Sequence, residues 1–151
     1  GNHHRLGIAQ KMGADVTLNF KNCDVIDEIM KITGGRGADS AIEALGTQAT
    51  FESALRSIKP GGTLSSLGVY SEDLKIPLSA FAAGLGDHKI NTALCPGGKE
   101  RMRRLMNVLA SNRLDLGLLV THQYKLDDIV AAYDLFAHQR DGVLKVAITP
   151  Q

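Results

Sequence analysis

The sequence predicts an α/β fold in which a parallel sheet is flanked by helices. Short β-branched runs alternate with helical stretches along the chain, which is typical of successive βαβ units. The length of 151 residues is close to that of one domain, and 44% hydrophobic with 22% charged residues are ordinary values for a folded protein. Disordered, collagen-like and coiled-coil classes are therefore excluded.

Helices and strands alternate in the first part of the chain. Apolar residues recur at helical spacing in each predicted helix, and Asp24 and Thr47 stand where N-caps are expected. Glycine-rich turns at 34–37 and 59–62 separate helices from the strands that follow them. The predicted order is helix 4–12, strand 16–20, helix 24–32, strand 38–45, helix 47–58 and strand 63–68.

The second part continues this alternation and then changes character. We expect an extended segment at 89–95, followed by a helix after Pro96-Gly97-Gly98. Strands at 119–125 and 143–149 flank a further helix, whose apolar residues are at helical spacing: Ile129, Ala132, Tyr133 and Phe136. A boundary near Leu114 divides the chain into regions 1–114 and 115–151.

Charge and cysteine content exclude several classes of partner and setting. A net charge of +1 is too small to create a long-range field for nucleic acid or an anionic membrane. Cys23 and Cys95 cannot supply a disulfide framework, and they have no metal-ligand spacing. The sequence contains no apolar run long enough to span a membrane and does not open with a secretory leader. We expect a cytoplasmic protein with no nucleic-acid or membrane partner. A start at Gly1 rather than Met indicates a processed, tagged or truncated product.

Several short segments form a specific pattern through their order and spacing. They are Arg5-Leu6, Gly13-Ala14-Asp15, Gly34 to Asp39, Ala44 to Thr47, Lys59 to Thr63, Cys95 to Gly98, Val120-Thr121-His122 and Lys145-Val146. Taken together, these segments resemble the medium-chain zinc-dependent alcohol dehydrogenases, from partway through the cofactor domain of that family to its C-terminus. The resemblance implies a Rossmann-like sheet without its first two strands and glycine-rich loop, with region 1–114 as a partial dinucleotide-binding domain and region 115–151 as part of the catalytic domain.

The resemblance implies hydride transfer between a small alcohol, or the matching aldehyde or ketone, and NAD or NADP. Zinc would polarise the alcohol oxygen. The implied cofactor contacts are Gly1, Asn2 and Arg5 near the adenosine ribose, Ala44, Leu45 and Gly46 over the adenine side, Leu67, Gly68, Ala93 and Cys95 at the nicotinamide carboxamide, and Lys145 toward the pyrophosphate. The family also implies a dimer-forming region at Leu74–Leu78.

The sequence lacks two parts of the family's machinery. The zinc ligands belong to the family's N-terminal domain, and no matching His-Glu pair or four-cysteine lobe occurs here. No GxGxxG motif is present to hold a pyrophosphate. We therefore assign no catalytic and no metal-binding residue, and expect this chain to be inactive alone.

The missing strands leave the strand at 16–20 without its family neighbours. Three explanations are open. The strand at 16–20 pairs with the strand at 38–45 instead, another chain fills the gap, or the sequence is a fragment. Unpaired strand edges favour a homo-oligomer.

The functional hypothesis is a fragment of an alcohol dehydrogenase, and the alternative is a non-catalytic nucleotide-binding or oligomerisation module. The basic residues Lys99, Arg101, Arg103 and Arg104 are interpreted as a solvated helix face.

Overall fold

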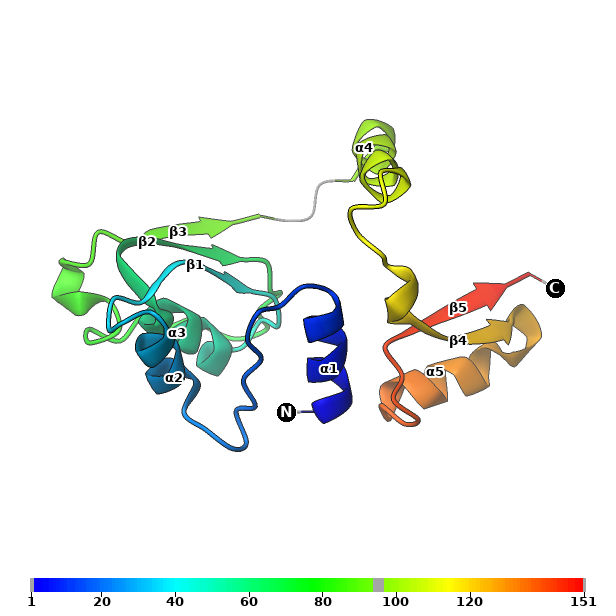
Figure 1. Cartoon of the computed structure of the whole chain (residues 1–151), viewed down its shortest axis with the longest axis horizontal. Coiled ribbons are helices and arrows are strands. Elements are labelled where there is room, and N and C mark those ends of the chain that lie inside the picture. Colours follow the sequence, from blue (N-terminus) through cyan, green and yellow to red (C-terminus); the bar gives the residue numbers. More distant parts are fainter. Residues whose placement is uncertain (1, 94–96, 151) are drawn as a thin grey trace. The chain divides into compact units, whose positions relative to one another are not determined.

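The computed structural model describes residues 2–93 and 97–150. The chain divides into two compact units, one formed by residues 22–97 and the other by residues 1–21 together with 98–151. The first unit contains a three-stranded parallel sheet of β1 (Ala38–Glu43), β2 (Ile58–Ser66) and β3 (Lys89–Thr92) in the order β1-β2-β3 (Figure 1). The predicted α/β class with parallel strands is confirmed.

Two helices with strong caps precede β1 and β2. The helix α2 (Val25–Ile32) begins after Asp24, whose carboxylate accepts hydrogen bonds from the backbone of Ile26 and Asp27. The helix α3 (Gln48–Ser57) begins with a capping box between Thr47 and Thr50. Such caps satisfy backbone N–H groups that have no partner inside the helix, so both predicted N-caps are confirmed.

The core of the first unit lies between α3 and one face of the sheet. Ala41, Leu64 and Ile90 are opposite one another across the three strands. Leu64 is fully buried, and Phe51 and Leu55 of α3 belong to the same cluster. Figure 1 shows α2 and α3 on the same side of the sheet. Ile42, which alternates with Ala41 along β1, is 72% exposed on the opposite face.

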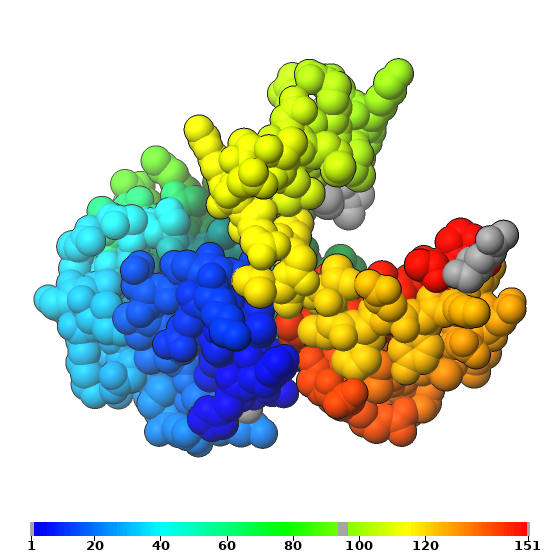
Figure 2. All heavy atoms as spheres, turned by 45° about the vertical axis from the view of Figure 1, so that its right-hand side comes forward, coloured from blue at the N-terminus to red at the C-terminus, as the bar shows by residue number. Residues whose placement is uncertain are grey.

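The second unit contains a βαβ element of β4 (Val120–Lys125), α5 (Ile129–Ala137) and β5 (Lys145–Thr149), with β4 and β5 parallel. Figures 1 and 2 both show α5 beside β5. The Arg5 guanidinium donates to the Val143 carbonyl oxygen at 3.1 Å, which joins the N-terminal helix to the segment before β5.

The remaining elements are α1 (His3–Lys11), α4 (Lys99–Ala110) and the short 3-10 turns Ala82–Gly84, Gly117–Leu119 and Leu126–Asp128. No helix in the described ranges has both the length and the apolar character needed to cross a membrane.

The predicted strand at 16–20 is wrong. These residues form no strand, and Val16 and Phe20 are 53% and 69% exposed. Within the described residues β1 pairs with β2 alone, so the segment has not moved onto β1. The physical reason is that a strand requires a partner for its backbone hydrogen bonds, whereas an alternating apolar pattern is a property of the segment itself.

The predicted turn at 59–62 is part of β2 rather than a separate element. Ile58 lies opposite Ala38 and Thr63 lies opposite Ser40, so extra residues of β2 bulge between these two pairs. Gly61 has a φ of 73°, a left-handed value that glycine adopts without a steric cost and that suits the third residue of a Pro-Gly turn. The strand ends at Ser66, two residues earlier than the sequence predicted.

We predict that Leu64→Ala lowers the free energy of unfolding by about 2–5 kcal/mol, because it leaves a cavity in the closed face between α3 and the sheet. Urea unfolding followed by circular dichroism measures this change. Leu85→Ala is the matched control, since Leu85 is 84% exposed, and should change stability by less than ~0.5 kcal/mol. Equal losses in the two variants would contradict the assignment of the core.

Candidate functional site at the carboxyl edge of the sheet

The candidate site is the edge of the sheet where β1, β2 and β3 end. Parallel strands bring their carboxyl ends to one edge, which is where open α/β sheets bind ligands. Several residues to which the family resemblance gives a cofactor role follow these strand ends directly. They are Ala44, Leu45 and Gly46 after β1, Leu67 and Gly68 after β2, and Ala93 after β3.

The last residue of β1, Glu43, is buried at this edge with 3% of its surface exposed. Its Oε1 atom accepts hydrogen bonds from Leu45 N at 2.7 Å, Gly46 N at 2.8 Å and Thr50 Oγ1 at 2.8 Å. Thr50 lies in the first turn of α3, whose partial positive charge favours an anion nearby. One carboxylate oxygen therefore holds both the loop after β1 and the start of α3.

The second carboxylate oxygen of Glu43 binds the loop after β2. The Tyr70 hydroxyl donates to Oε2 at 2.6 Å, and the Ser66 hydroxyl lies 3.4 Å from the same atom. Ser66 and Tyr70 also bond each other at 2.7 Å. The Tyr70 ring stands edge-on to Phe51 of α3, with centroids 6.2 Å apart. The loops after β1 and β2 are thus linked through one side chain.

Glu43 is held as an anion. Burial by itself would raise its pKa, but hydrogen bonds from Tyr70, Gly46, Leu45 and Thr50 outweigh burial and lower the pKa to about 2. Burial and the hydrogen bond to Glu43 raise the pKa of Tyr70 above 10.0. At neutral pH the pair is therefore a carboxylate and a neutral phenol, with the phenol as donor.

Two glycines allow the loops to touch. A Cβ atom on Gly68 would overlap the backbone of Gly46 and the Glu43 carboxylate. A Cβ atom on Gly46 would overlap the backbone of Val69, and Gly46 also has a φ of +92°. The space between the loops is filled by backbone, so these glycines serve the contact between the loops rather than a ligand.

Two hollows lie on either side of Tyr70. One, of about 440 Å³, is lined by residues 66–70 with Thr92 and Ala93. The other, of about 170 Å³, is lined by residues 46–48 and 70–74. The larger hollow has the backbone groups and apolar atoms that suit one end of a dinucleotide, in agreement with the type of ligand that strand ends of such sheets bind.

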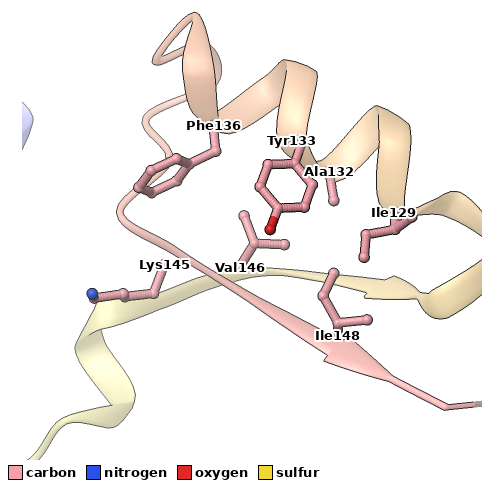
Figure 3. A pocket seen from close by; sticks show the side chains of 7 residues that line it. All are labelled: Ile129, Ala132, Tyr133, Phe136, Lys145, Val146 and Ile148. Atoms are coloured by element: carbon pink, nitrogen blue, oxygen red, sulfur yellow. The ribbon is translucent and has the colours of Figure 1, made fainter.

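Five further residues were predicted to contact the cofactor, namely Gly1, Asn2, Arg5, Cys95 and Lys145. Gly1 and Cys95 lie outside the described residues. Asn2 caps α1, with its side chain accepting from His4 N and Arg5 N, and Arg5 bonds Val143. Lys145 lies at the margin of an apolar pocket between α5 and β5, and its amine points away from the apolar side chains (Figure 3). The cofactor roles of these residues stay predictions.

The segment Leu74–Leu78 forms no strand. It is fixed to α3 instead, because the Gln48 side chain donates to Lys75 O at 2.8 Å and accepts from Lys75 N at 2.9 Å. Leu78 is 72% exposed. The dimer-forming role of this segment stays a prediction.

The residues that the structure describes form no zinc site. Across residues 2–93 and 97–150, no three His, Cys, Asp or Glu side chains lie close enough together to hold a metal ion. Glu43 is not a free metal ligand either, because its buried carboxylate already accepts hydrogen bonds at both oxygens. The described residues therefore do not fit the zinc ion that the resemblance implies.

Sequence reasoning missed Glu43 and Tyr70. The local signal was an acidic residue ending an apolar strand just before Ala44-Leu45-Gly46, which indicates a carboxylate at the carboxyl edge. Nothing in the local pattern pointed to Tyr70, which lies 27 residues further along.

Comparisons with known proteins give a consistent result. The family model described as zinc-binding dehydrogenase matches residues 1–111. An alcohol dehydrogenase of Cupriavidus necator is 82% identical over 150 residues, which cover 99% of this chain and 41% of that protein. An NADP-dependent isopropanol dehydrogenase of Clostridium beijerinckii is 35% identical over 143 residues, with coverages of 93% and 41%.

A solved structure agrees with these sequences. Alcohol dehydrogenase TADH from Thermus sp. ATN1 matches with a TM-score of 0.87 and 26% identity, over 99% of this chain and 42% of that one. The chain thus spans about two fifths of the length of the relatives it matches.

We predict that Glu43 makes stability depend on pH. Its pKa is about 2 in the folded state and ordinarily 4.5, so its contribution is fully present above 4.5 and is lost as the pH falls toward 2. The unfolding free energies of the wild type and E43Q should therefore differ at pH 7 and converge as the pH falls from 4.5 toward 2. Urea titrations at several pH values measure this, and a difference independent of pH would contradict the ionised state.

We predict that Gly68→Ala destabilises the protein by about 1–3 kcal/mol, because the methyl group forces the two loops apart. Thermal unfolding measures the loss. Gly7→Ala is the control: this helical glycine has no atom within 4 Å of the added methyl group, and the change should stabilise by ~0.5–1 kcal/mol. An unchanged melting temperature for Gly68→Ala would show that the loops do not touch in solution.

Proposed function

Because the chain belongs to the zinc-binding dehydrogenase family, we propose that it forms one wall of the nicotinamide dinucleotide site of an alcohol dehydrogenase. The observation that carries the proposal is the cross-linked carboxyl edge of the β1-β2-β3 sheet, where Glu43 fixes two loops beside a hollow of about 440 Å³. The 82% identity to an alcohol dehydrogenase supports the reaction type.

The ligand is NAD or NADP. When bound, its nicotinamide accepts or supplies a hydride. The chain's own residues bind and orient it, because residues 66–70 with Thr92 and Ala93 enclose one end. Leu45, in the loop after β1, has an exposed apolar side chain at the same edge of the sheet. The relative from Clostridium beijerinckii is named for NADP and isopropanol, which favours a small secondary alcohol as the substrate.

Zinc binding and alcohol activation belong to residues outside this sequence. The described residues do not fit a zinc ion, and the sequence has no phosphate-binding glycine motif. The 151-residue chain alone therefore does not oxidise alcohols.

Two organisational features complete the proposal. Region 1–114 is part of the dinucleotide-binding domain and region 115–151 accompanies the catalytic domain. The open edge of β1 and the exposed segment Leu74–Leu78 favour a homo-oligomer. The two cysteines are too few for a disulfide framework, which favours a cytoplasmic setting. The alternative, a non-catalytic nucleotide-binding or oligomerisation module, gains no support from relatives that are named as dehydrogenases.

A chimeric enzyme tests the function. The chain replaces the matching 41% of the Cupriavidus necator alcohol dehydrogenase, so that the remainder of that enzyme supplies what this chain lacks. We predict that the chimera oxidises a small alcohol with NAD⁺ or NADP⁺, measured by the absorbance of the reduced nicotinamide. The 151-residue chain with added zinc should show no turnover.

Three controls make the result decisive. The intact relative gives the reference rate, and zinc analysis and circular dichroism show whether the chimera is folded and loaded. A folded, zinc-loaded chimera that binds neither dinucleotide would overturn the proposed function. Turnover by the chain alone would overturn the assignment of alcohol activation to other residues.

A further inference from the structure

The surroundings of Glu43 direct hydrogen-bond donors at both oxygens of its carboxylate. Leu45 N and Gly46 N are backbone donors that cannot reverse their role, and both point at the same carboxylate oxygen. The Tyr70 hydroxyl donates to the other oxygen. An ionised carboxylate is the side chain that accepts at both oxygens, so the negative charge at position 43 has a structural purpose.

The same hydrogen bonds use up donors that a ligand would otherwise meet. Leu45 N and Gly46 N are directed at the Glu43 side chain, and Leu67 N donates to Glu43 O at 2.7 Å. The Leu45 side chain, in contrast, is 69% exposed. The loop after β1 therefore presents an apolar side chain at the edge and keeps its N–H groups inside.

We propose that Glu43 is the positioning residue of this edge, and that it holds the loops 44–46 and 67–70 in the arrangement that shapes the hollow of about 440 Å³. This inference rests on the proposed function for its ligand. It adds that a side chain outside the lining of the hollow sets the spacing of the loops around it.

E43Q is the informative substitution because the glutamine side chain has nearly the same shape. Its amide oxygen can replace Oε1 and accept from Leu45 N and Gly46 N, while its NH₂ group faces the Tyr70 and Ser66 hydroxyls, which can turn to accept. The fold is therefore retained, but the charge that strengthens these bonds is lost.

D39N is the matched control. Asp39 lies on the same strand, and hydrogen bonds from Arg36 and Lys59 likewise lower its pKa to about 2. It is exposed at the amino end of β1, away from the edge. Both variants therefore remove one carboxylate charge from β1, and only E43Q removes it from the loops.

The first measurement is amide hydrogen exchange in the 151-residue chain. We expect exchange at Leu45 and Gly46 to be roughly tenfold faster in E43Q, which corresponds to ~1.4 kcal/mol, and unchanged in D39N. Exchange at the core residue Leu64 reports the global stability that E43Q also lowers, so a purely structural effect would speed exchange at Leu45 and Gly46 only as much as at Leu64. Tyr70→Phe, which removes one donor and keeps the ring, should show a smaller effect of the same kind.

The second measurement is the dissociation constant of the chimera for reduced dinucleotide, followed by nicotinamide fluorescence. We expect it to rise roughly tenfold in E43Q and to stay unchanged in D39N. Unchanged exchange in E43Q, or faster exchange with an unchanged dissociation constant, would overturn the positioning role. A wild-type chimera that binds no dinucleotide would instead overturn the proposed function. The exchange rates of Leu45 and Gly46 would still show whether Glu43 holds the loops.

Discussion

The buried carboxylate of Glu43 is the interaction on which the arrangement of the carboxyl edge depends. A charged group with 3% exposure is costly unless hydrogen bonds replace its water, and here donors from three elements do so. Removing any of these donors would leave part of the charge unsatisfied. The loop after β1, the first turn of α3 and the loop after β2 are therefore stabilised together, which is why two glycines can bring the loops into contact.

The core on one side of the sheet gives this edge its fixed base. Leu64 and its strand neighbours pack under α3, and α3 in turn brings Thr50 to Glu43 and Phe51 to Tyr70. Apolar burial thus positions the helix, and the helix positions the polar groups. The packing and the hydrogen bonds therefore share the helix α3, and both loops are bonded within the protein itself before any ligand binds.

The sequence predicted those parts of the structure that depend on neighbours along the chain. Asp24 and Thr47 were identified as N-caps because a cap bonds backbone groups two or three residues away. The segment 16–20 was predicted as a strand and is not one, because pairing depends on residues elsewhere. The Glu43–Tyr70 bond spans 27 residues and has no local signal. The family resemblance assigned a ligand class to the edge through Ala44–Gly46, but it did not identify the side chain that organises the edge.

The charge of Glu43 also limits which part of a dinucleotide this edge can hold. Two like charges ~6 Å apart repel by about 3 kcal/mol at an effective dielectric constant of ~20. A helix N-terminus after a strand often receives a phosphate, but the first turn of α3 already meets the Glu43 carboxylate. A phosphate would therefore be opposed at this position, whereas an uncharged group would not. The pyrophosphate of the proposed dinucleotide would then be held by elements other than the first turn of α3.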